Sequence, residues 1–196
     1  MEVIENHIIR DPAITSKVLQ LANSSFYKGM KEITTVREAL VRLGASEVAN
    51  IVALVTQKQN FKTKDSAMKE FMDRLWVHSV ASAVGANWIA KQSGMQGAIQ
   101  EAFFAGLLHD VGKLFLFKVI EDLKQKGKLN SGLSVEFIED VVHNMHAEQG
   151  YELLSKWNLP ESYREVARKH HDAKVDDRDK LLLAVRLADK ACHKCG

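Results

Sequence analysis

Residues 102–113 read AFFAGLLHDVGK, and this stretch carries the strongest structural signal in the chain. An apolar run leads into His109-Asp110. Lys113 follows His109 by four residues and Asp110 by three, so all three side chains can share one side of a helical turn. The dipeptide alone is a weak signal, because His171-Asp172 repeats it. Small neighbours would leave room for a metal ion or an anion: Ala102, Ala105, Gly106 and Gly112. The alternative interpretation is a buried cluster of hydrogen-bonded polar side chains that joins two helices.

Helical periodicity continues on both sides of this stretch. One pattern runs from Ala67 to Gln92, and a second starts at Ile99, passes through His109 and continues to about Lys124. Further helices are expected at 134–145, 147–157, 161–169 and from about 179 onward. The chain has two prolines, and we find no strand with clean alternation. The sequence therefore predicts an all-α fold, a multi-helix bundle.

The first third carries its own helix signals. Asp11 and Pro12 are typical of a helix start, and Thr35 with Glu38 matches a capping box. A loop is expected over Phe26–Glu32. The polar stretch 58–66 marks a boundary, so we predict a small N-terminal helical subdomain over residues 1–62, packed on a helical core over residues 63–196.

Composition excludes several classes of protein. Among 196 residues, 27 Lys and Arg against 25 Asp and Glu leave a net charge of +2, which gives no support to nucleic-acid binding. The longest uncharged run, Leu75–Ala90, is too short and too polar for a membrane span, and no secretory signal is visible. The two cysteines, Cys192 and Cys195, form half a zinc site at most, and we interpret them as an incidental C-terminus. We expect a cytoplasmic protein.

Other histidines and one acid join His109-Asp110 as candidate ligands. His78 shares its helix face with core residues, and His143 and His146 are spaced i, i+3. His170 and His171 form a doublet. Asp189 is the only acid on the apolar face of the last helix, where an unpartnered carboxylate would be costly.

A set of imidazoles and carboxylates without thiolates suits Fe, Mn, Ni, Zn or a Mg-like ion. Two such ions close together would form a phosphohydrolase arrangement, which clamps a phosphoryl group and lowers the pKa of a bridging water. The other interpretation needs no ion: neutral imidazoles donate and accept hydrogen bonds at once, so the histidines can form a hydrogen-bonded core. The sequence leaves both open.

The chain resembles the HDOD domain, the HD-related output domain of bacterial signalling proteins. The N-terminal signature is carried by DPAI at 11–14, LANSSFY at 21–27, ITTV at 33–36 and ALVRLG at 39–44. The central block is LWVHS at 75–79 with residues 102–113. The C-terminal block is HAEQG at 146–150, WNLPE at 157–161, His170-His171 and LAD at 187–189.

The resemblance covers nearly the whole chain and implies a small N-terminal helical subdomain on an HD-type core. It implies a regulatory role in signal transduction, exerted through other signalling proteins or domains. No general catalytic activity comes with the family. Its members usually have a further helix ahead of the part that begins here, so we expect a fragment or an N-terminally short form.

The related HD-GYP phosphodiesterases have a fuller metal-site order: His, His-Asp, His, His-His and Asp. The resemblance implies that order for His78, His109, Asp110, His146, His170, His171 and Asp189, which makes them the candidate ligands of one or two divalent ions. Lys113 matches the lysine of their HDxGK string, which makes it the candidate for holding a phosphate. Asp110 and Lys113 are then the candidate catalytic residues.

Two features depart from that pattern. Arg74 stands where those enzymes have a Glu that can bind metal, and a cation there would oppose a further ion. No Gly-Tyr-Pro follows His171. We therefore favour a regulatory, protein-interacting domain whose HD-type pocket binds metal or a phosphorylated ligand, or is a relic. The rival hypothesis is a metal-dependent phosphohydrolase acting on nucleotides or phosphate esters.

Overall fold

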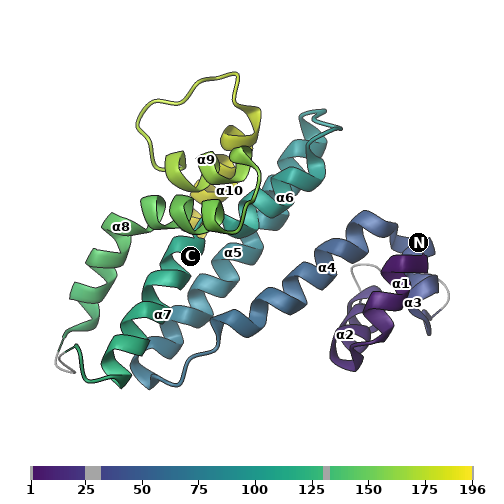
Figure 1. Cartoon of the computed structure of the whole chain (residues 1–196). Coiled ribbons are helices and arrows are strands. Elements are labelled where there is room, and N and C mark those ends of the chain that lie inside the picture. The colour runs from purple at the N-terminus through teal and green to yellow at the C-terminus, as the bar shows by residue number, and fades with distance from the viewer. Residues whose placement is uncertain (1, 25–31, 130–132, 196) are drawn as a thin grey trace. The chain divides into compact units, whose positions relative to one another are not determined.

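The computed structural model of the chain describes residues 2–24, 32–129 and 133–195, and every regular element within those ranges is a helix (Figure 1). This confirms the predicted all-α fold class. The chain divides into two compact units, Met1–Asn60 and Phe61–Gly196.

The first unit is built from α1 (Glu2–Ile9), α2 (Pro12–Ala22), α3 (Val36–Leu43) and α4 (Ala45–Lys58). A short 3₁₀ turn, η1 (Gln59–Phe61), follows. These four helices enclose a small apolar core that includes Val18, Leu40 and Ile51, each at most 2% exposed.

Both predicted helix starts in the first unit are confirmed. The Asp11 carboxylate accepts hydrogen bonds from the backbone N–H groups of Ala13 and Ile14, at 2.9 and 3.1 Å. The Thr35 hydroxyl accepts the Glu38 N–H at 3.1 Å, and the Glu38 carboxylate accepts the Thr35 N–H in return. Each pairing satisfies amides that a helix start leaves without intrahelical partners.

The connection from α2 to α3 is tied at its two ends. The Asn23 side chain donates to the Ile33 carbonyl oxygen at 2.7 Å and accepts the Ile33 N–H at 2.8 Å. The loop predicted over Phe26–Glu32 lies outside the described residues, apart from Glu32 itself.

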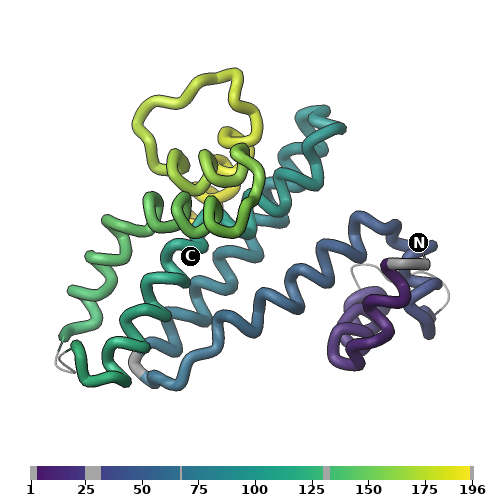
Figure 2. Tube along the Cα trace, in the orientation of Figure 1, coloured from purple at the N-terminus to yellow at the C-terminus, as the bar shows by residue number. Residues whose placement is uncertain are grey.

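The second unit comprises α5 (Ser66–Gln92), α6 (Ile99–Leu108), α7 (Val111–Gln125), α8 (Val135–Lys156), α9 (Glu161–Lys169) and α10 (Lys180–Cys195). Helix α5 packs against both α6 and α10, while α8 packs against α7 and α9. In Figure 2 the yellow C-terminal helix α10 returns to α5, so the last turns of the chain lie beside the middle of this unit.

Two helix boundaries differ from the prediction. The helix expected from Ile99 to about Lys124 is broken at His109-Asp110, which separates α6 from α7. Neighbouring side chains on one continuous helix point about 100° apart, so the break is what lets both residues face the same interior point. In contrast, the two helices expected over 134–145 and 147–157 form one helix, α8, with His146 in its interior.

Two glycines explain how closely these helices approach. A Cβ at Gly106 would lie 2.7 Å from the Ser82 carbonyl oxygen of α5. A Cβ at Gly112 would overlap the His146 carbonyl oxygen of α8. The sequence interpretation that these small residues leave room for an ion was therefore wrong for Gly106 and Gly112, because neighbouring backbone fills their space. Gly112 instead lets α7 approach His146 of α8, and Gly106 lets α6 approach α5.

Within the part of the chain that the structure describes, no single helix is both long and apolar enough to cross a membrane. The bent pair Val36–Leu43 and Ala45–Phe61 reaches that length and composition only when its two helices are counted together.

Candidate metal centre

Asp110 lies at the centre of a cluster of buried polar side chains in the second unit. Its Oδ1 is 3.5 Å from Nε2 of His146 and 3.4 Å from Nε2 of His170. Its Oδ2 is 3.4 Å from Nε2 of His78 and 3.5 Å from Nε2 of His109. One carboxylate thus separates two pairs of imidazoles, which come from α5, from the α6–α7 break, from α8 and from the end of α9.

Backbone carbonyls orient three of these imidazoles. Nδ1 hydrogen bonds to a main-chain oxygen in each, at 2.7 Å for His109 with Gly106, 2.7 Å for His146 with His143, and 2.8 Å for His170 with Ala167. A carbonyl oxygen only accepts, so each Nδ1 carries the proton. In the neutral ring the Nε2 lone pair then points at Asp110, which is how metal-ligating histidines are held.

The imidazole nitrogens of the cluster lie close to one another in two pairs. Nε2 of His146 lies 3.3 Å from Nε2 of His170, and the same distance separates Nε2 of His78 and His109. Burial lowers the pKa of His146 to about 4, so this ring is neutral at pH 7. With Nδ1 of both His146 and His170 protonated, their two Nε2 lone pairs converge, and a cation between them would relieve the repulsion.

Asp110 also has the properties expected of a group that binds a cation. No hydrogen bond of good geometry reaches its buried Oδ1 from any described residue. Burial opposes its charge, but His109, His170, His78 and Lys113 hold the pKa of Asp110 well below its usual range, so the carboxylate is ionised. An ionised and unsatisfied oxygen in a dry interior is costly unless a cation or a donor completes it.

His171 belongs to the same half of the cluster as His146 and His170. One ligand atom from each of these three rings and one from Asp110 all lie within 4.8 Å of one another. His171 is exposed, unlike the other two rings. Partial burial of its ring and the neighbouring imidazoles of His170 and His146 lower the pKa of His171 to about 4, which leaves it unprotonated at pH 7.

Asp189 contributes to the other half from α10. Its Oδ1 lies 3.2 Å from Nε2 of His78 and 3.7 Å from Nε2 of His109. Burial opposes its charge, but its contacts with His109 and His78 hold the pKa of Asp189 well below its usual range. Burial lowers the pKa of His78, and the two carboxylates Asp110 and Asp189 outweigh it and raise that pKa to about 9.

Lys113 extends from α7 to the same carboxylate. Its Nζ donates to Asp110 Oδ2 at 2.7 Å, and its side chain is 14% exposed. Lys113 also lines a cavity of about 1290 Å³ that opens beside the cluster between α5, α7, α8 and the end of α10. Lys113, the candidate for holding a phosphate, thus lies between the buried Asp110 carboxylate and the cavity.

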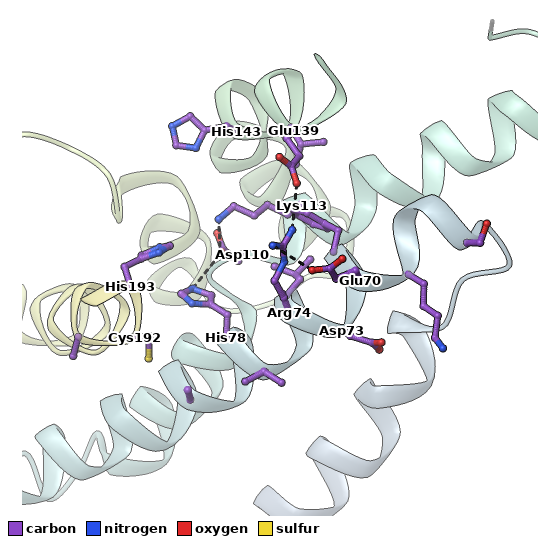
Figure 3. Close-up of a pocket in the computed structure, with 18 residues that line it drawn as sticks. Glu70, Asp73, Arg74, His78, Asp110, Lys113, Glu139, His143, Cys192 and His193 are labelled. Atoms are coloured by element: carbon purple, nitrogen blue, oxygen red, sulfur yellow. Dashed lines mark hydrogen bonds and ion pairs between the residues drawn. The ribbon is translucent and has the colours of Figure 1, made fainter. Parts of the chain in front are cut away.

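Arg74 lies at the cavity wall and outside the cluster. Its guanidinium pairs with Glu70 at 3.7 Å and with Glu139 at 3.5 Å (Figure 3). Arg74 is 66% exposed, and two carboxylates offset its charge. The expected opposition between this cation and a metal ion is therefore weakened by solvent and by its partners.

The sequence analysis missed His193. Its Nε2 lies 3.2 Å from Asp189 Oδ1, and its ring centroid is 4.8 Å from that of His78. The signal was present, because Asp189 and His193 are four residues apart on one helix face. His143, by contrast, lines the cavity while His146 faces Asp110.

A comparison with protein families matches the HDOD domain over residues 1–173. The chain belongs to the HDOD domain family. The HDOD resemblance of the three sequence blocks is thereby confirmed.

Individual relatives agree with this membership. The chain is 25% identical over 169 residues to an uncharacterized protein of Treponema pallidum, covering 84% of this chain and 32% of that protein. The crystal structure of an HDOD domain protein of unknown function from Geobacter sulfurreducens matches with a TM-score of 0.74 at 26% identity, over 97% of this chain and 65% of that one.

A second crystal structure shares the fold. It is a protein from Shewanella amazonensis, named as a candidate metal-dependent phosphohydrolase, with a TM-score of 0.77 at 21% identity over 97% of this chain and 69% of that one. The HDOD chain described here spans about a third of the Treponema protein and about two thirds of the Geobacter chain.

Proposed function

We propose that this HDOD domain is a regulatory module whose histidine–aspartate cluster binds divalent metal ions, and whose adjoining cavity receives a phosphorylated ligand. The observation that carries the proposal is the buried Asp110 Oδ1, which lies between Nε2 of His146 and Nε2 of His170 with no hydrogen bond of good geometry. Two converging imidazoles and an ionised oxygen form a cation-binding group.

The donors divide into two sets that share Asp110. One set comprises His78, His109 and Asp189, and the other comprises His146, His170 and His171. When bound, divalent ions would supply Lewis acidity toward a phosphoryl oxygen and lower the pKa of a coordinated water.

The donor chemistry narrows the choice of ion. Five of the seven donor residues are imidazoles and none is a thiolate. Imidazole suits Fe, Ni and Zn, whereas Mg²⁺ prefers carboxylate, carbonyl and water oxygens. We therefore favour Fe, Ni or Zn over Mg as the bound metal.

The cationic side chains that line the cavity, Lys113 and Arg74, indicate an anionic ligand. Lys113 reaches both the cavity and Asp110 Oδ2, so its ammonium can hold an anionic group next to the cluster. Arg74 lines the same cavity, but Glu70 and Glu139 already offset its charge. A phosphorylated small molecule fits this combination, with its phosphate toward Lys113. The family resemblance adds the expectation of a protein partner that binds differently when the cavity holds its ligand.

One observation favours a second candidate, a metal-dependent phosphohydrolase. The position of Asp110 between two imidazole sets matches the sharing of a carboxylate in two-metal hydrolytic sites. Hydrolysis of a nucleotide or phosphate ester in proportion to metal content would support this candidate over a purely regulatory role.

Elemental analysis tests the proposal. Protein purified without a polyhistidine tag or chelator is compared with Asp110→Asn and with Asp122→Asn, which changes an exposed carboxylate on the same helix. We expect near-stoichiometric metal in the parent and in Asp122→Asn, and none in Asp110→Asn with its helical circular dichroism retained. Metal-free protein in all three, even after reloading, would contradict the proposal.

A further inference from the structure

The last turn of α10 brings a histidine to the cluster that the family pattern does not include. Nε2 of His193 and Nε2 of His78 each lie 3.2 Å from the same oxygen, Oδ1 of Asp189. Nε2 of His109 lies 3.7 Å from that oxygen. Three imidazole nitrogens from three distant parts of the chain therefore surround one carboxylate oxygen.

Asp189 Oδ1 is, after Asp110 Oδ1, the second buried carboxylate oxygen of the cluster that lacks a hydrogen bond of good geometry from a described residue. Asp189 is 4% exposed, and its Oδ1 receives no hydrogen bond of good geometry from any described residue, although three nitrogens are near. Donors that encircle a buried anionic oxygen without aligning to it are arranged as ligands around an ion rather than as hydrogen-bond partners.

The helix geometry makes His193 a natural companion of Asp189. The two residues are four apart on α10, so their side chains lie on one face, as in other metal sites built on a single helix. The His193 side chain is 59% exposed, whereas Asp189 is buried. Figure 3 shows His193 approaching His78 from the α10 side of the cavity. The imidazole thus covers the cluster from the solvent side.

We propose that His193 is a protein ligand of the ion held by His78, His109 and Asp189, and that it takes a position otherwise filled by water. With Asp110 Oδ2 near His78 and His109, this half of the cluster offers five donor atoms. The inference rests on the proposed metal centre and makes that centre asymmetric.

The asymmetry has a consequence for α10. Metal sites closed by protein donors are structural, whereas sites that keep an open position accept water or substrate. The half formed by His146, His170, His171 and Asp110 offers four donor residues among those described, one fewer than the half that includes His193. The ion of the His78 half would therefore tether the last turn of α10 to α5.

The test uses Mn²⁺-loaded protein and the variant His193→Ala. His143→Ala is the matched control, because it removes an imidazole from the same cavity but none from the cluster. Loss of a direct ligand should weaken one of the two Mn²⁺ affinities by about tenfold or more, since even residues that only orient a ligand have effects of that size. Electron–nuclear double resonance with oxygen-17-labelled water should count one more metal-bound water in His193→Ala.

A second measurement follows the stability of the last turn of α10, which the bound ion is expected to hold against α5. Hydrogen exchange in the last turn of α10 should slow on metal loading in the parent and in His143→Ala, and should stay fast in His193→Ala. If the parent binds two ions while His193→Ala keeps its affinities, its water count and its exchange protection, His193 is not a ligand and the metal centre stands. If the parent binds no metal, the metal centre and this inference both fail.

Discussion

Asp110 Oδ1 lies 3.4 Å from Nε2 of His170, yet this buried oxygen accepts no hydrogen bond of good geometry from any described residue. The Nδ1 proton of His170 is committed to the Ala167 carbonyl oxygen, so its Nε2 faces an ionised carboxylate with a lone pair. Holding two electron-rich atoms this close in a buried site has an electrostatic cost that a cation would relieve. The account of this domain depends on that relationship.

Metal binding should therefore stabilise the second unit. A ligand present at a hundred times its dissociation constant raises the free energy of unfolding by about 2.7 kcal/mol, provided the unfolded chain does not bind it. We expect thermal unfolding of the parent to shift upward on adding Mn²⁺ or Zn²⁺ and to stay unchanged for Asp110→Asn. An equal shift in both proteins would mean that the ion binds elsewhere.

Lys113→Met should tighten metal binding. The ammonium lies 2.7 Å from Asp110 Oδ2 and competes with any cation for that oxygen, so its removal should raise the Mn²⁺ affinity measured by calorimetry. The same variant should weaken the binding of inorganic phosphate to the metal-loaded protein. Lys126→Met, which removes an exposed lysine at the C-terminal cap of the same helix, should do neither. Unchanged phosphate binding in Lys113→Met would contradict the role given to this lysine.

Gly112→Ala should destabilise the second unit strongly. The added methyl group overlaps the His146 carbonyl oxygen, so α7 and α8 must separate, at a cost of about 1–3 kcal/mol in the free energy of unfolding. Gly97→Ala is the control, because open space surrounds that position. It should change the free energy of unfolding by less than about 0.5 kcal/mol. Urea denaturation followed by circular dichroism separates the two, and equal midpoints would refute the close approach.

Glu121 should control acid stability at the other end of α7. Burial opposes its charge, but the Lys64 N–H, the Thr63 hydroxyl and Lys118 lower the pKa of Glu121 to about 2, from 4.5 in the unfolded chain. A carboxyl with a depressed pKa stabilises the fold above its unfolded pKa, and that stabilisation is lost as the pH falls from 4.5 toward 2.

Glu121→Gln should accordingly flatten the fall in unfolding free energy across that pH interval. Asp122→Asn, an exposed carboxylate next in the chain, controls for the loss of one negative charge. Identical pH profiles for the parent and Glu121→Gln, measured by urea titration at each pH, would show that this contact is not formed.

Local signals predicted the parts of the fold that depend on neighbours in sequence. Asp11 and the Thr35–Glu38 pair cap their helices because each cap involves residues within three positions. The break at His109-Asp110 was not predictable in this way. It serves contacts with His78, His146 and Asp189, which lie 31 or more residues away in sequence and which no local window contains.

The candidate site shows the same division. The candidate ligands were named from the order that the HD-GYP resemblance implies, and the structure brings their side chains together. The role of Gly106 and Gly112 was predicted wrongly, because only the packed helices reveal which backbone fills their space. His193 was overlooked for the opposite reason. Its spacing from Asp189 is visible in the sequence, but its place between Cys192 and Cys195 favoured the interpretation of an incidental C-terminus.

The most direct test of the central claim is the electron paramagnetic resonance spectrum of the Mn²⁺-reconstituted domain at two ions per chain. If Asp110 bridges both ions, the spectrum should show exchange coupling between two Mn²⁺, and Asp110→Asn should lose it. A spectrum of isolated Mn²⁺ at full loading, or the same coupled spectrum in Asp110→Asn, would contradict the account.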